Sequence, residues 1–288
     1  MYDLHSHILP GIDDGAKDLA TSLEMARAFV AQGIQVVACT PHILPGVYAN
    51  RGPQIIAAVA ALQAAIDEHA IPLRLVAGAD NHIVPTFVAD LRAGTLLPIN
   101  GSRYVLVEPP HHVMPPRLEA LFFDICIAGY VPILTHPERL TWVAPNYAVI
   151  ERLVRGGVWM QITAGALTGA FGPHPQSLAE RMLDDGFVHI IASDAHGARR
   201  RPPLMAEARV IAERRTGSLE ATHLVDTRPR GILDNAEPFS LPQPIPSALG
   251  ARHVSRNEPS AEAVGGMAGP RSGAGDGSIA GRLRRFFN

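Results

Sequence analysis

The sequence predicts an α/β protein built on parallel β-strands, and three observations lead to this prediction. Short apolar runs rich in β-branched residues alternate with longer stretches whose apolar residues recur at helical spacing. The alternation repeats at about 30 residues per unit, as in strands joined by crossover helices. Hydrophobic residues make up 47% of the 288 residues, enough for a large core and too many for wholesale disorder. Seven such units would close into a barrel, and an open doubly wound sheet is the alternative.

The predicted strands are short and strongly apolar. In chain order they cover residues 2–4, 36–39, 73–77, 104–107, 131–134, 158–162 and 189–192. No Gly-x-Gly-x-x-Gly motif follows the first of them. The dinucleotide-binding form of the open sheet is therefore disfavoured.

The predicted helices lie between the strands. The first should begin at Thr21, where Glu24 would complete a capping box, and should end at Gly33. The second should begin near Pro53, with one apolar face formed by Ile55, Val59, Leu62 and Ile66. Four more are predicted at 116–128, 146–155, 176–185 and 203–215.

The composition changes near Ala236, where Pro, Ser, Gly and Ala begin to dominate. We therefore predict one domain over 1–235 and a disordered tail over 236–288. The last ten residues, 279–288, place apolar side chains on one face with arginines between them. They predict a short amphipathic basic helix with weak affinity for a membrane surface or a partner.

Charge, cysteine content and hydropathy narrow the protein class. The formal net charge of −2 argues against non-specific binding to nucleic acid. Two cysteines cannot form a disulfide framework, which favours a reducing compartment. No signal-peptide pattern precedes the first strand, and no run approaches the roughly 18 apolar residues of a membrane span. The predicted location is the cytoplasm.

Residues able to bind metal ions follow nearly every predicted strand. Because the carboxyl ends of the strands in a parallel barrel share one mouth, these side chains should converge there. Imidazole and carboxylate donors without thiolate suit Mn, Fe or Zn at a catalytic site, and their number exceeds the need of one ion, so two or three ions are expected. The set comprises His5, His7, Asp13, Asp14, His42, Asp80, Glu108, His136, Asp194 and His196.

Other histidines and two arginines fall near the same strand ends. His82 is a reserve ligand, and His111 and His112 are candidates for lining the mouth because they follow Glu108 closely. His189 lies within a strand and should be a core residue. Arg139 and Arg201 each trail a predicted ligand by a few residues. A guanidinium group there could hold a phosphoryl group in bidentate fashion.

A thiol-based phosphatase is excluded by spacing. Such enzymes need a cysteine, five residues and then an arginine. The residue six positions after Cys39 is Pro45, and the residue six positions after Cys126 is Pro132. No cysteinyl-phosphate intermediate is therefore expected.

The combined motifs resemble a known family. They are HSHILPGIDDGAK at 5–17, Thr40-Pro41-His42, SRYVLVE at 102–108, His136-Pro137-Glu138-Arg139 and ASDAHGARRRPP at 192–203. In this order and spacing they are similar to those of the bacterial manganese-dependent protein-tyrosine phosphatases. That family belongs to the polymerase-and-histidinol-phosphatase (PHP) superfamily and is associated with capsule and exopolysaccharide synthesis. The similarity covers about residues 1–235.

The resemblance implies a distorted seven-stranded barrel with three metal ions, Mn²⁺ being expected and Fe or Zn the alternatives. It assigns phosphate-binding or catalytic roles to His42, Arg139 and Arg201. The implied substrate is phosphotyrosine on a protein, in particular a bacterial tyrosine kinase of polysaccharide synthesis, hydrolysed by direct attack of metal-bound hydroxide. The implied ligands are His5, His7, Asp14, His42, Asp80, Glu108, His136, Asp194 and His196.

One departure from the family pattern leaves alternatives open. The family usually has Glu where this chain has Asp80, within Gly78-Ala79-Asp80. A shorter side chain bridges two ions less easily, so a catalytically weak metal-binding scaffold is one alternative. The other is a histidinol-phosphate-type or other small-molecule phosphatase, or a nuclease, on the same barrel.

Overall fold

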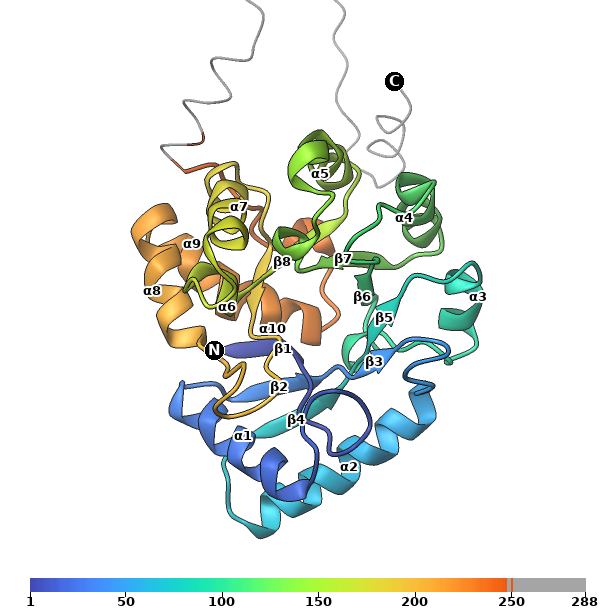
Figure 1. The fold of residues 1–288 in the computed structure, drawn as a ribbon, viewed down its shortest axis with the longest axis vertical. Coiled ribbons are helices and arrows are strands. Elements are labelled where there is room, and N and C mark those ends of the chain that lie inside the picture. Colours follow the sequence, from blue (N-terminus) through green and yellow to red (C-terminus); the bar gives the residue numbers. More distant parts are fainter. Residues whose placement is uncertain (248–249, 251–288) are drawn as a thin grey trace, which may run out of the picture.

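The computed structural model describes residues 1–247 and residue 250, and its centre is made of parallel strands with helices packed outside them (Figure 1). Three strands form one sheet in the order β1 (Tyr2–Ser6), β2 (Val36–Cys39) and β4 (Arg74–Ala77). A second, curled sheet of six strands has the order β3-β5-β6-β7-β8-β9. Its members are β3 (His42–Ile43), β5 (Asp80–His82), β6 (Tyr104–Glu108), β7 (Val131–Thr135), β8 (Trp159–Thr163) and β9 (Ile190–Ala192). The prediction of an α/β fold with parallel strands is confirmed.

All seven predicted strand runs are found, but two of them continue beyond a break. β2 resumes as β3 after Pro41, and β4 resumes as β5 after Gly78. Pro41 has no N–H to donate, and a Cβ on Gly78 would lie 3.1 Å from Thr40 Cγ2, so both segments bend at the same level. Strands β3 and β5 were not predicted, because segments of two or three residues are too short to show a strand pattern in the sequence.

The two sheets meet again at β1 and β9. The backbone N–H of His7 donates to the carbonyl of Ala195 at 2.9 Å, and the N–H of Asp194 donates to the carbonyl of His5 at 2.9 Å. A parallel bridge between Ser6 and Ala195 accompanies these bonds. The loops after β1 and β9 are therefore held side by side at the carboxyl ends of their strands.

Side chains along β6 point alternately to the inner and outer faces of the sheet, and the inner series ends in a polar residue. Tyr104 and Leu106 of β6 belong to the inner apolar cluster, whereas Val105 and Val107 pack in the larger cluster shared with the helices. Successive side chains of a strand point to opposite faces, so Glu108 continues the inward series. The inner face of β6 thus ends in a buried carboxylate.

The first two helices confirm the helical periodicity and correct one cap. Helix α1 spans Leu19–Ala31, and its N-cap is Asp18, whose side chain accepts a hydrogen bond from the N–H of Thr21 at 2.8 Å. The predicted capping box at Thr21 is therefore wrong, because the Asp18 carboxylate fills that role three residues earlier. Helix α2 spans Gly52–Glu68, and its buried positions include the predicted apolar face.

Four further helices match the predicted ranges, and four short ones were missed. The matches are α4 (Leu118–Ile127), α5 (Tyr147–Arg155), α7 (Pro173–Asp184) and α8 (Met205–Thr216). Segments of about one turn are too short to show a helical period. Those missed are α3 (Phe87–Arg92), α6 (Ala164–Leu167), α9 (Ser218–Thr222) and α10 (Arg228–Leu233), with a π-helical turn at His223–Thr227. Within the described part of the chain, no helix combines the length and apolarity that crossing a membrane requires.

The described fold extends beyond the predicted domain boundary at 236. The Tyr104 hydroxyl donates to the carbonyl of Ala236 at 2.9 Å, and Arg228 Nε donates to the carbonyl of Pro242 at 2.6 Å. Ser247 is buried, and its hydroxyl donates to Asp184 at 2.9 Å. Residues 236–247 therefore pack against the body of the protein. The predicted helix at 279–288 lies outside the described residues.

Candidate metal centre

The nine predicted ligands come together at the carboxyl ends of the strands. Each has a nitrogen or a carboxylate oxygen within 3.6 Å of another member. We call these nine residues the ligand cluster. The separations are 3.4 Å for His5–Asp80, 3.2 Å for His7–Asp194, 3.6 Å for His42–Asp14, 3.2 Å for His42–Glu108, 3.6 Å for His136–Glu108 and 3.3 Å for His196–Asp14.

The spacing of these donor atoms suits bound cations. Two atoms each about 2.1 Å from one ion, at a tetrahedral angle, lie about 3.4 Å apart. Four groups of donor atoms within 4.8 Å of one another occur in the described residues. They are His7-Asp14-His42-His196, His5-His7-Asp80, His42-Asp80-Glu108 and Glu108-His111-His136.

The imidazoles of His5 and His7 show that this arrangement needs a cation. His5 Nδ1 lies 2.8 Å from the amide oxygen of Gln161, and His7 Nδ1 lies 2.7 Å from a carboxylate oxygen of Asp13. Both oxygens only accept, so each Nδ1 carries the proton in the neutral ring. The two Nε2 atoms then present lone pairs to each other at 3.3 Å. A metal ion relieves that repulsion, and the outer hydrogen bonds orient both rings.

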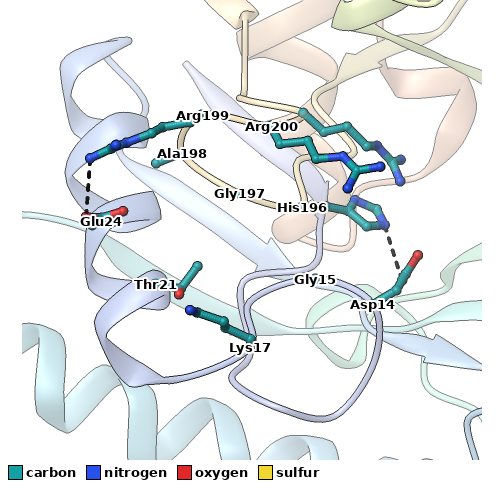
Figure 2. Close-up of a pocket in the computed structure, with 11 residues that line it drawn as sticks. Asp14, Gly15, Lys17, Thr21, Glu24, His196, Gly197, Ala198, Arg199 and Arg200 are labelled. Atoms are coloured by element: carbon teal, nitrogen blue, oxygen red, sulfur yellow. Dashed lines mark ion pairs between the residues drawn. The ribbon is translucent and has the colours of Figure 1, made fainter.

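The same logic separates Asp13 from Asp14, which the sequence alone could not do. Asp13 is engaged outside the cluster, since it accepts from the backbone N–H groups of Gly15 and His42 as well as from His7. His196 Nδ1 lies 2.9 Å from the carbonyl of Asp194, which leaves its Nε2 facing Asp14 at 3.3 Å (Figure 2). Asp14 is therefore the carboxylate that is free for an ion.

Asp80 lies at the buried centre of the cluster. Both of its carboxylate oxygens are inaccessible and accept no hydrogen bond, although His5 and His42 nitrogens lie 3.4 and 3.5 Å away. Burial lowers the pKa of His5, but the charges of Asp80 and Asp194 outweigh it and raise that pKa to about 9. The carboxylates thus favour positive charge here, which protons supply when metal ions do not.

Three residues of the site have strained backbones. His136, Asp194 and Arg201 have φ angles of 35°, 50° and 57°. Non-glycine residues in this left-handed region cost about 1–3 kcal/mol each. Such strain persists only where the surrounding structure holds it, and here it coincides with the residues that sequence analysis assigned to the site.

Two arginines and the ring of Phe171 lie at the edge of the ligand cluster. Asp194 Oδ2 accepts from Arg139 Nη1 and from Arg201 Nη2, while Asp194 Oδ1 faces His7. The two guanidinium carbons lie 4.7 and 5.8 Å from the centroid of the Phe171 ring. A Cβ on Gly165 would lie 2.8 Å from that ring, so glycine is needed there. Arg139 and Arg201 are therefore fixed at the edge of the cluster.

Other residues of the site were missed by sequence analysis or given minor roles. Gln161 could have been noticed as the polar residue of an apolar strand, whereas Phe171 leaves no signal in the sequence. His82, the reserve ligand, contacts Glu108 at 3.1 Å. His111 faces the same carboxylate at 3.4 Å, but His112 is exposed.

The cysteines take no part in the site. Cys39 is fully buried, and burial raises the pKa of its thiol. Burial raises the pKa of Cys126 to about 11. Both thiols stay protonated near neutral pH, in agreement with the exclusion of thiolate catalysis.

A pocket of about 510 Å³ opens beside the cluster. It is lined by the loop between β1 and α1, by Thr21 and Glu24 of α1 and by the loop after β9, and its lining includes His196 and Asp14 of the ligand cluster (Figure 2). Arg199 points away to Glu24, whereas Arg200 extends on the side of His196. The pocket therefore joins the ligand cluster to a basic surface.

Comparison with known proteins gives consistent matches. Residues 1–234 match the family described as capsular polysaccharide synthesis, CpsB/CapC. The tyrosine-protein phosphatase YwqE of Bacillus subtilis (strain 168) is 37% identical over 246 residues, which is 85% of this chain and 96% of YwqE. The putative tyrosine-protein phosphatase CapC of Staphylococcus aureus is 31% identical over 72% of this chain and 81% of CapC.

Solved structures agree with the sequence matches. One from a study of YwqE of Bacillus subtilis and CpsB of Streptococcus pneumoniae, described as unique metal-dependent tyrosine phosphatases, superposes with a TM-score of 0.79 at 36% identity. It covers 85% of this chain and 99% of the solved one. A histidinol phosphate phosphatase from Lactococcus lactis has a TM-score of 0.50 at 13% identity over 74% of this chain and 94% of its own, which shows a shared fold.

Proposed function

The chain belongs to the capsular polysaccharide synthesis family CpsB/CapC, and from that premise we propose that it is a metal-dependent protein-tyrosine phosphatase. The observation that carries the proposal is the pairing of an ion-binding cluster with two arginines on the shared carboxylate of Asp194. Ions and guanidinium groups side by side are what phosphoryl transfer requires. The two sheets together would form the seven-stranded barrel of the PHP superfamily.

The nine residues of the ligand cluster would hold two or three ions. Mn²⁺ suits their imidazole and carboxylate donors, and no thiolate is present to favour a structural zinc site. When bound, such ions act as Lewis acids and make water a nucleophile near neutral pH. Asp80 remains suitable despite being shorter than the usual Glu, because it lies within 3.5 Å of both His5 and His42.

Arg139 and Arg201 would hold the non-bridging oxygens of the phosphoryl group. Their side chains are only 18% and 27% exposed, and Phe171 and Asp194 fix them from two sides. Guanidinium groups held in this way need little reorganisation as charge is redistributed in the transition state. His42 contacts Asp14, Asp80 and Glu108, so it would tie the ion sites together while bordering the substrate.

The substrate we propose is phosphotyrosine on a protein, in particular a tyrosine kinase of polysaccharide synthesis. Relatives named as tyrosine-protein phosphatases support the substrate class. Tyrosinate is a fair leaving group, since its conjugate acid has a pKa of about 10, so little help from a general acid is required. The free thiols of Cys39 and Cys126 agree with a reducing compartment such as the cytoplasm.

The proposal is tested with the full chain. The protein is stripped with chelator, its metal content is measured by elemental analysis, and Mn²⁺ is added back. We expect restored hydrolysis of a phosphotyrosyl peptide, with much slower hydrolysis of a phosphoseryl peptide and of histidinol phosphate. Faster turnover of histidinol phosphate would replace the proposed substrate class. Absence of bound metal under every loading condition would refute the metal centre itself.

A further inference from the structure

We propose that His111 is an additional ligand of the ion held by Glu108 and His136. The inference rests on the proposed function, since it assumes that the cluster binds ions, and it adds a residue outside the nine predicted ligands. It also gives a role to the loop between β6 and α4.

The geometry of three side chains carries the inference. His111 Nε2 lies 3.4 Å from Glu108 Oε1, and His136 Nε2 lies 3.6 Å from the same oxygen. The two imidazole rings have centroids 5.0 Å apart. One donor atom from each of the three residues lies within 4.8 Å of the other two, as in the other groups of the cluster. Two nitrogens facing one carboxylate oxygen at these distances leave space for a shared ion.

The backbone of the loop is fixed so that His111 stays there. The carbonyl of His111 accepts from the N–H of Thr141 at 2.9 Å and from its hydroxyl at 3.2 Å. The indole N–H of the buried Trp142 donates to the carbonyl of Pro110 at 3.0 Å. Thr141 and Trp142 closely follow the 3₁₀ turn after His136. The loop carrying His111 is therefore tied to the segment carrying His136, so both rings are positioned together.

This end of the cluster also has the greatest need of another donor. Asp80, which lies close to His5 and His42, is 3.9 Å from His136 Nε2. Without His111, the ion beside His136 would have one imidazole, Glu108 and the more distant carboxylate of Asp80. A catalytic ion of this kind normally has three close protein ligands and an open position. His111, which is 31% exposed, would supply a third close ligand.

The test compares His111→Ala with His112→Ala, its exposed neighbour, in the full chain. Metal-free protein is titrated with Co²⁺, and binding is followed by visible absorption and by elemental analysis after dialysis. We expect His111→Ala to lose one class of ion or to bind it roughly 10- to 100-fold more weakly, the range known even for outer partners of ligands. His112→Ala should match the wild type. His111→Asp, which restores a donor atom, should recover part of the binding.

The outcomes separate this inference from the proposed function. If the wild type binds ions and hydrolyses phosphotyrosine while His111→Ala shows unchanged Co²⁺ stoichiometry and affinity, His111 is not a ligand and the function stands. A fall in turnover with unchanged Co²⁺ binding overturns the ligand role in the same way. If the wild type binds no ion at all, both conclusions fail. Thermal denaturation of the metal-free variants checks that each remains folded.

Discussion

The two ends of strand β9 carry buried polar clusters that are satisfied in opposite ways. At its amino end, the fully buried Arg228 donates to both carboxylate oxygens of Glu220 at 2.8 and 2.9 Å and to the carbonyls of His189 and Pro242. Beyond its carboxyl end, the ligand cluster leaves both oxygens of Asp80 without a hydrogen bond.

The difference separates buried charges that hold the fold together from buried charges that are left for a ligand to complete. A buried ion pair in which every guanidinium nitrogen has an acceptor is complete within the protein, and it contributes to one defined packing of α9, α10 and β9. A buried carboxylate without donors is costly unless something from outside completes it. Lone pairs of His5 and His7 that face each other add to that cost, which a cation removes. The amino end therefore stabilises the fold, and the carboxyl end is a place for ligands.

Removing a central ligand should have the largest effect. His136→Ala takes away an imidazole that faces both Asp80 and Glu108, so we expect metal content and phosphatase activity to be lost together. Elemental analysis and a phosphotyrosyl peptide assay on the same sample provide the measurement. His174→Ala, on the exposed surface of α7, is the control. Full activity in His136→Ala would show that His136 is not a required metal ligand.

Breaking the Arg228–Glu220 ion pair at the amino end of β9 should lower the stability of the fold. Glu220→Gln leaves the charge of Arg228 buried without its counter-ion, which costs about 3–5 kcal/mol in the free energy of unfolding. Urea denaturation measures the change, and the exposed Glu213→Gln should show almost none. Metal stoichiometry should be unaffected. If the folded Glu220→Gln protein bound less metal than the wild type, the two clusters would not be independent.

Removing an arginine from the edge of the ligand cluster should lower turnover without changing metal binding. Arg201→Ala removes one guanidinium group from Asp194, and we expect kcat to fall by about 10²- to 10³-fold, as for loss of one transition-state donor. Metal content should stay near that of the wild type. Arg199→Ala, whose side chain is 90% exposed, should retain nearly full activity. Equal metal loss in Arg201→Ala and His136→Ala would contradict the separate roles of arginines and ligands.

The smallest expected effect is a pH dependence at the structural end. Burial, together with the charge of Arg228, lowers the pKa of His189 from 6.5 to about 3. Between these pH values His189 binds a proton in the unfolded chain but not in the folded protein, so the contribution of His189 to stability falls as the pH drops below 6.5. The loss from pH 7 to pH 5 should be about 2 kcal/mol. Urea denaturation of metal-free wild type and His189→Gln measures it. Equal pH dependence in the two proteins would disprove it.

Much of the site could be predicted because its residues follow strands. Polar residues follow the apolar runs of the predicted strands, so the sequence positions of Glu108 and Asp80 already place them toward the carboxyl ends of those runs. His111 could not be assigned in this way, since its position depends on hydrogen bonds from Thr141 and Trp142. The N-cap at Asp18 was missed because Thr21 and Glu24 offered an equally good local pattern.

The class of fold, the seven main strand runs and the kinds of donor atoms follow from the sequence alone, because these depend on local patterns and on side-chain chemistry. The folded arrangement was needed to show that Asp14 rather than Asp13 faces His196 of the ligand cluster, that Gln161 holds the His5 ring, and that Phe171 contacts two arginines. The reason is that hydrogen-bond partners from distant strands choose which nitrogen of an imidazole keeps its proton. That choice, made by residues of both sheets, determines where the lone pairs point.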